Sequence, residues 1–188
     1  MTQLLLFPGA GSASTHSSLV AIEAAIAPMP CVREDFGYRK AGRKAPDRPP
    51  VLLQAVRDAA APMLASDRRL LLGGRSMGGR ICSLAVADES DPVPAVGLVL
   101  ICYPLHPPGK PETLRIEHFP RLRVPCLVIS GTKDAFGSRV ELEHWTATIP
   151  GPVTHYWLEG KGHDLKGCDA VIAATVADWI RSEPDRQG

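Results

Sequence analysis

The sequence lacks several features that would place it in a specialised class of protein. Its apolar runs fall far short of the ~18 residues that a membrane span needs. Its formal net charge is only +1, so no overall field would draw it to nucleic acid or to a membrane surface. The first residues, MTQLLLFPGAG, contain no basic segment and too short an apolar run for a secretory signal. We therefore expect neither nucleic acid nor a membrane among its partners.

Cysteine is present, but not in the pattern of a disulfide framework or a zinc site. The five cysteines are odd in number, widely spaced and without any C-x-x-C pair. They are Cys31, Cys82, Cys102, Cys126 and Cys168. We expect no metal and no cofactor, and a reducing cytoplasm as the location.

The order of apolar segments predicts an α/β fold. The 188 residues are 45% apolar and 22% charged, enough for one domain over 1–188 with a buried core, and we expect 182–188 to be a disordered tail. Short apolar runs alternate with amphipathic stretches, which is typical of a doubly wound, mostly parallel sheet. About six strands are expected, at 3–7, 31–36, 69–72, 95–101, 124–130 and 153–158.

Three segments between these strands have apolar residues at helical spacing. Their ridges are Leu19, Ile22 and Ile26; Leu52, Val56 and Ala59; and Ile172, Val176 and Ile180, beside Trp179. Two other segments, 37–50 and 103–120, are rich in glycine or proline, and we expect a loop and an irregular stretch with at most one helical turn. Both follow predicted strands, so both are candidates to border a ligand crevice.

The motif with the clearest chemistry is GRSMG at 74–78, which matches the G-x-S-x-G nucleophile elbow. A serine on a sharp strand-to-helix turn has strained backbone, and the residues two before and two after it must lack a Cβ for the turn to close. A leucine-rich strand precedes Ser76 and a helix-compatible segment follows it. The alternative is an ordinary glycine-rich turn with no chemical role.

A nucleophilic serine needs a base, and the base needs a group that orients it. In elbow enzymes the order along the chain is serine, acid, histidine. Among the six histidines only His163 follows the last predicted strand, and Asp134 follows the strand before it. Asp164 is a poorer acid, because its neighbour His163 would have to present the far ring nitrogen to it. The alternatives are an exposed loop histidine and a turn aspartate.

Acyl transfer also needs donors for the developing oxyanion. We expect these to be the backbone N–H of Met77 and that of Ala10 or Gly11, in the loop FPGAGSAS after the first strand. A phosphate-cradling loop is the alternative there, but neither G-x-G-x-x-G nor the P-loop pattern occurs. Four residues near these in sequence are candidates to contact substrate: Arg75, Tyr103, His106 and Phe136.

Longer motifs resemble one family of proteins. GRKAPDRPPVL, GRSMGGR, YPLHPPGKPETLR, GTKDAFG and GKGHDLK are similar to the α/β-hydrolases of a small family that includes a testis-expressed protein, a regulatory subunit of the NSL chromatin complex and many bacterial members. The likeness runs from about Phe7 to Trp179. It implies a trimmed α/β-hydrolase fold without the first two strands or a large lid, with Ser76, Asp134 and His163 as a catalytic triad.

The resulting hypothesis is a serine hydrolase that cleaves small acyl esters or thioesters and acts as a monomer or homodimer. The alternative is a non-catalytic binding or scaffold protein, since one branch of the family serves in a chromatin complex and fold does not imply function. The basic residues Arg39, Lys40, Arg43, Lys44 and Arg48 could attract an anionic substrate or form a solvated loop.

Overall fold

The protein is built on one sheet of six strands, all parallel, in a computed structural model that describes residues 1–66 and 68–182. The strands lie in the order β2-β1-β3-β4-β5-β6. Their bounds are β1 Thr2–Phe7, β2 Cys31–Arg33, β3 Arg69–Arg75, β4 Gly97–Ile101, β5 Cys126–Gly131 and β6 Val153–Leu158. The predicted doubly wound α/β fold is confirmed, and the sheet is parallel throughout.

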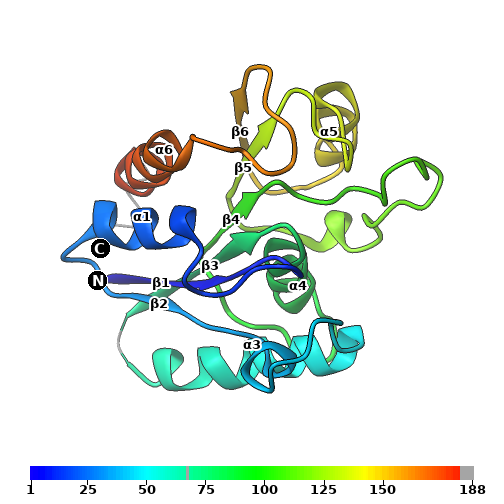
Figure 1. The fold of residues 1–188 in the computed structure, drawn as a ribbon. Coiled ribbons are helices and arrows are strands. Elements are labelled where there is room, and N and C mark those ends of the chain that lie inside the picture. Colours follow the sequence, from blue (N-terminus) through cyan, green and yellow to red (C-terminus); the bar gives the residue numbers. More distant parts are fainter. Residues whose placement is uncertain (67, 183–188) are drawn as a thin grey trace.

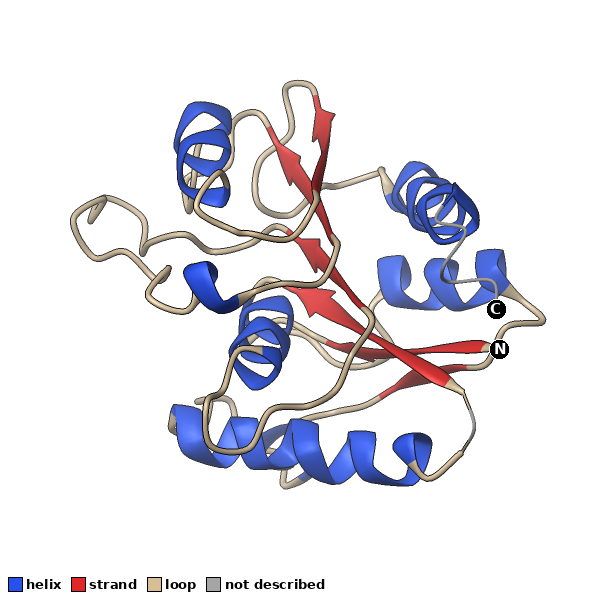
Figure 2. Cartoon of the chain, turned by 180° about the vertical axis from the view of Figure 1, so that it is seen from behind, coloured by secondary structure: helices blue, strands red, loops and turns tan. Residues whose placement is uncertain are grey.

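Helices cover both faces of this sheet, so nearly every residue of β1, β3, β4 and β5 is buried. Helices α1 (Ser17–Ile26) and α6 (Asp169–Ser182) lie side by side on one face, and α3 (Pro49–Leu64), α4 (Met77–Val86) and α5 (Arg139–Thr146) lie on the other (Figure 1, Figure 2). Along β1, Leu4 and Leu6 face α1 and α6 while Leu5 and Phe7 face α3 and α4.

The three predicted helical ridges are largely as expected. Leu19, Ile22 and Ile26 of α1 are buried, as are Ile172, Val176 and Ile180 of α6. In α3 the buried ridge continues through Ala60, and Ala59 is only partly buried. Pro49 and Pro50 occupy the start of α3, where their missing N–H groups would have no helical partner in any case.

Several predicted boundaries were wrong. Strand β2 ends at Arg33 rather than at 36, and a short helix α2 (Gly37–Lys40) begins the segment predicted to be a loop. Strand β3 runs on through Gly73 and Gly74 to Arg75. Residues 103–120 are irregular as predicted, with one 3-10 turn, η1 (Phe119–Arg121). Of the predicted disordered tail, Ser182 ends helix α6, and 183–188 lie outside the described residues.

The strand order creates a crevice at the carboxyl ends of β1 and β3. From β1 the chain moves to β2 at the sheet edge, and from β2 it returns to β3 on the other side of β1. The loops after β1 and β3 therefore leave the sheet in opposite directions, which is where open α/β sheets bind ligands. The loop after β1 contains Gly9–Ser12, and Ser76 directly follows β3.

Candidate active site

Ser76 stands between β3 and α4 in the strained backbone that an elbow requires. Its φ is 51° and its ψ is −118°, a conformation that residues with a side chain rarely adopt. A Cβ at Gly74 or at Gly78 would collide with the carbonyl oxygen of Phe7 at the end of β1. The two motif glycines therefore let the elbow pack directly against β1.

Three predicted residues meet at the carboxyl edge of the sheet. The Oγ of Ser76 lies 2.8 Å from Nε2 of His163, and Nδ1 of His163 lies 2.8 Å from Oδ2 and 3.0 Å from Oδ1 of Asp134. The side chain of Asp134 is 1% exposed and that of His163 is 24% exposed. With its proton on Nδ1 donated to Asp134, His163 presents a lone pair on Nε2 that accepts from the serine hydroxyl. The neighbouring Asp164 makes no such contact; its carboxylate accepts from the backbone N–H of Lys166 at 3.3 Å.

The histidine is held on several sides. The Nη2 of Arg75 donates to the carbonyl oxygens of His163 and Asp164, at 2.8 and 2.6 Å. The Sγ of Cys102 donates to the same His163 carbonyl at 3.1 Å. The ring of Phe136 packs on the imidazole with 4.1 Å between centroids, and its backbone N–H donates to Asp134 at 2.8 Å. These contacts fix both the loop and the ring plane of His163.

The glycine loop after β1 lies beside Ser76. A Cβ at Gly9 would be 3.4 Å from the Cβ of Ser76. Ala10, Gly11 and Met77, the three predicted oxyanion donors, all line the cleft in front of Ser76. The carbonyl oxygen of Ala10 accepts a hydrogen bond of 2.8 Å from the hydroxyl of Tyr38, on α2. Tyr38 anchors this loop, and the sequence offered no signal for it because the two residues are far apart in the chain.

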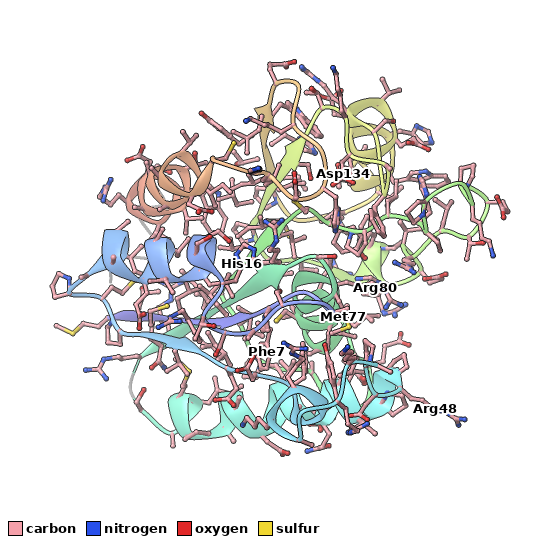
Figure 3. The ribbon with its side chains drawn as sticks, in the orientation of Figure 1. Phe7, His16, Arg48, Met77, Arg80 and Asp134 are labelled. Atoms are coloured by element: carbon pink, nitrogen blue, oxygen red, sulfur yellow. The ribbon has the colours of Figure 1, made fainter. Side chains whose placement is uncertain are left out.

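The cleft has a volume of about 640 Å³, within the usual range for small-molecule sites. Its described lining is Gly9, Ala10, Gly11, Ser12, Pro46, Arg75, Ser76, Met77, Arg80, Pro104, Arg115, Phe136, His163 and Asp164. Sequence reasoning missed Arg80 and Arg115. The spacing of Arg80, four residues after Ser76 and thus one helical turn on, is a signal that could have identified it. Figure 3 shows Arg80 near Met77, on the same side of the molecule as Asp134.

Two of the candidate substrate contacts lie behind the cleft wall. Tyr103 is buried, and its hydroxyl donates to the Arg115 carbonyl at 2.6 Å. His106 is buried with its Nδ1 2.8 Å from the carbonyl oxygen of Pro107 and its Nε2 3.3 Å from a Glu141 oxygen. Neither is among the residues that line the cleft, whereas Arg75 and Phe136 are.

The basic residues of 37–50 also stay outside the described cleft lining, to which this segment contributes only Pro46. Lys40 pairs with Glu34, and Arg43 pairs with Asp47 at 2.7 Å. Arg48 extends into solvent away from Asp134 (Figure 3). The arrangement is that of a solvated loop.

Cys102, Asp134 and His163 could in principle form a metal site, since one potential ligand atom from each lies within 4.8 Å of the others. The carboxylate and the imidazole are already joined by their hydrogen bond. Burial raises the pKa of Cys102 to about 12, and its sulfur already donates to the His163 carbonyl at 3.1 Å. The donor set suits an acid–base pair better than a metal.

A sequence model described as an alpha/beta hydrolase domain matches residues 1–179. The chain belongs to the alpha/beta hydrolase family. Among solved structures, this hydrolase is similar to Est1E from Butyrivibrio proteoclasticus, with 13% identity and a TM-score of 0.78 over 96% of this chain and 87% of that one. A serine hydrolase homologue from Coxiella burnetii gives 14% identity and a TM-score of 0.76 over 96% and 86% of the two chains.

A type II thioesterase, BorB from the borrelidin biosynthetic cluster, gives 21% identity and a TM-score of 0.68 over 96% of this chain and 93% of that chain. At these identities the likeness establishes the shared fold. Within the described residues, no helix of this hydrolase is both long enough and apolar enough to cross a bilayer.

Proposed function

We propose that this alpha/beta hydrolase is a serine hydrolase that cleaves small acyl esters or thioesters. One observation carries the proposal: an unbroken hydrogen-bonded relay runs from Asp134 through His163 to Ser76. The relay ends at a serine with strained backbone, and that serine opens onto a cleft large enough for a small molecule. A serine hydroxyl becomes a useful nucleophile only when a base is placed in this way.

In the proposed reaction, Oγ of Ser76 bonds to the acyl carbon while Nε2 of His163 takes the hydroxyl proton. The bond from the acyl carbon to oxygen or sulfur then breaks, and His163 gives the proton to the leaving alcohol or thiol. Water repeats the sequence on the acyl-enzyme, which releases the acid and returns a proton to Ser76. Asp134 holds the imidazole in the required tautomer and stabilises its cation.

Backbone N–H groups stabilise the negative charge on the oxygen of the tetrahedral intermediate. The N–H of Met77 sits at the first turn of α4, whose dipole favours negative charge there. The N–H of Ala10 or Gly11, which also line the cleft, is the second donor.

The known proteins of similar fold support this class of chemistry, since they include an esterase domain from Rhodothermus marinus and a type II thioesterase. We place the chain in the small, lidless branch of the family because its motifs resemble that branch over most of its length. The location we propose is the cytoplasm, and in keeping with this no disulfide joins any of the five cysteines, all of which the structure describes.

The test is covalent labelling by a fluorophosphonate, read as the mass of the intact protein. We expect a single adduct on the wild type, none on Ser76→Ala, and a loss of esterase activity of at least about 10³-fold in that variant. Ser12→Ala is the matched control, because Ser12 lines the same cleft but bonds to the Gly9 carbonyl rather than to His163. A folded wild type that takes no label would favour the scaffold alternative, and capture of a stable partner would then follow.

A further inference from the structure

The wall of the cleft carries two arginines that the proposed chemistry does not use. Arg80 lies on α4, and Arg115 lies in the irregular segment between β4 and η1. The backbone of Arg115 is held by hydrogen bonds on both sides of its Cα. Its N–H donates to the Leu105 carbonyl at 2.9 Å, and its own carbonyl accepts from the Tyr103 hydroxyl at 2.6 Å. The buried Tyr103, predicted to touch substrate, instead sets the position of Arg115.

Neither arginine has an acidic partner among the residues that the structure describes. Elsewhere Arg33, Arg43, Arg57 and Arg139 each contact a carboxylate. By contrast, Nε of Arg80 is shielded from solvent and lacks any hydrogen-bond partner in the described structure.

The two guanidinium groups are close enough to affect each other. Burial, and then the charge of Arg80, lower the pKa of Arg115 from its usual value. Like charges that are partly desolvated repel, and an unpaired buried donor costs free energy as well. Among the described residues that line the cleft, Asp164 is the only acid, so this lining as a whole is positive. An anion bound there would remove both penalties.

We propose that the substrate of this hydrolase is an anion, an acyl compound whose carboxylate or phosphate binds between Arg80 and Arg115 while its scissile carbonyl lies at Ser76. A planar guanidinium can donate two parallel N–H bonds to two oxygens of a carboxylate or of a phosphate. The cleft extends from the nucleophile to both arginines, so it has room for a charged end beyond the carbonyl. This inference rests on the proposed serine hydrolase activity.

The experiment compares matched substrates that differ in one anionic group. The first pair places it on the acyl side: the 4-nitrophenyl half-ester of adipic acid against 4-nitrophenyl hexanoate. The second pair places it on the leaving group: butyryl phosphopantetheine against butyryl pantetheine. For the wild type we expect kcat/KM to favour the anionic member of at least one pair by about 10- to 100-fold, the range for hydrogen bonds to charged groups. The pair that responds identifies whether the anion is an acyl carboxylate or a phosphate.

Arg80→Gln and Arg115→Gln should each lower the ratio of kcat/KM for the anionic substrate to kcat/KM for the neutral substrate to nearly one. Lys44→Gln is the matched control, since Lys44 is an exposed cation outside the cleft lining. It should keep the wild-type ratio. Two independent arginines are tested, so a folding defect in one variant leaves the other to decide.

Equal kcat/KM within both pairs, or a ratio that survives in both arginine variants, would overturn the inference while leaving the hydrolase intact. If no ester is turned over and Ser76 takes no label, the proposed function itself fails. The anion site is then decided by calorimetry on Ser76→Ala with the two pantetheine thioesters. Tighter binding of the phosphorylated one, lost with Arg80→Gln, would support the site, and equal binding would refute it.

Discussion

Arg75 joins the strand that leads into Ser76 to the loop that contains His163. Its Nη2 donates to the carbonyl oxygens of both His163 and Asp164, at 2.8 and 2.6 Å, and the residue is only 6% exposed. These two hydrogen bonds join the last residue of β3 to the loop that follows β6, a different strand of the sheet. The distance between Ser76 and His163 therefore depends on an arginine that need not touch the reacting atoms.

Arg75→Lys should lower kcat for a neutral 4-nitrophenyl ester by about 10-fold, with KM changed by less than about 3-fold. A lysine keeps the charge, but its side chain is more flexible and its tetrahedral ammonium does not reproduce the two coplanar N–H bonds of Nη2, so the His163 loop is held less well. Arg121→Lys is the control, because Arg121 also donates to two carbonyls, those of Ala87 and Glu117, away from the cleft. Equal kcat in the two variants would contradict the positioning role.

Gly78→Ala should destabilise the fold by about 3 kcal/mol or more, because the new Cβ collides with the backbone of Phe7 and Pro8, which has little room to move. Gly11→Ala is the control: a Cβ there meets nothing within 4 Å. Urea unfolding measures both. A Gly78→Ala protein as stable as Gly11→Ala would mean that the elbow and β1 are not packed as closely as described.

Tyr38→Phe should lower kcat about 5-fold, the factor that corresponds to one hydrogen bond of about 1 kcal/mol. The hydroxyl holds the Ala10 carbonyl, and its loss would loosen the loop in which we propose the second oxyanion donor. KM should change little, because the donor acts mainly on the transition state. Tyr156→Phe, an exposed tyrosine on the edge strand β6, should match the wild type. If kcat for Tyr38→Phe equals that for Tyr156→Phe, the Tyr38 hydroxyl does not contribute to catalysis.

The sequence was sufficient to predict the residues that the sheet itself positions. Ser76, Asp134 and His163 each follow a predicted strand, and parallel strands bring their carboxyl ends to one edge. The same logic identified the glycine loop after β1. Gly73 fell outside the predicted strand 69–72 but lies within β3, where a Cβ would press on the backbone of Val99 in the neighbouring strand. Glycine there serves strand packing and not the turn.

Residues that are held in place by irregular segments of the chain could not be predicted in this way. Cys102 has a φ of 51°, a turn that cysteine rarely adopts and that no local pattern announces. After it the chain carries Tyr103 and His106 into the interior and returns Arg115 to the cleft. A segment without periodicity gives no indication of which side chains face inward, so nearness to a strand end was a poor guide here.

His118 should make stability depend on pH. It is 1% exposed, its Nε2 lies 2.8 Å from the Ser83 hydroxyl, and its Nδ1 has no partner among the described residues. Burial, then the charges of Arg80 and Arg121, lower its pKa to about 4, against 6.5 for an ordinary histidine. Between these values the unfolded chain binds more protons than the folded one. The contribution of His118 to stability is therefore complete above pH 6.5 and is lost as the pH falls toward 4.

For the wild type this histidine should remove about 2 kcal/mol of unfolding free energy between pH 7 and pH 5, as the two pKa values imply. The glutamine in His118→Gln does not titrate. The unfolding free energy of this variant should therefore fall by about 2 kcal/mol less than that of the wild type over the same pH range. Urea unfolding at pH 5, 6 and 7 measures both curves, and comparing their slopes cancels the carboxylates that the two proteins share. His144→Gln, which removes an exposed histidine from α5, should keep the wild-type slope. If His118→Gln also kept it, the imidazole would be protonated in the folded protein at pH 5, and the buried face of α4 would have to contain an anion or water that balances this charge.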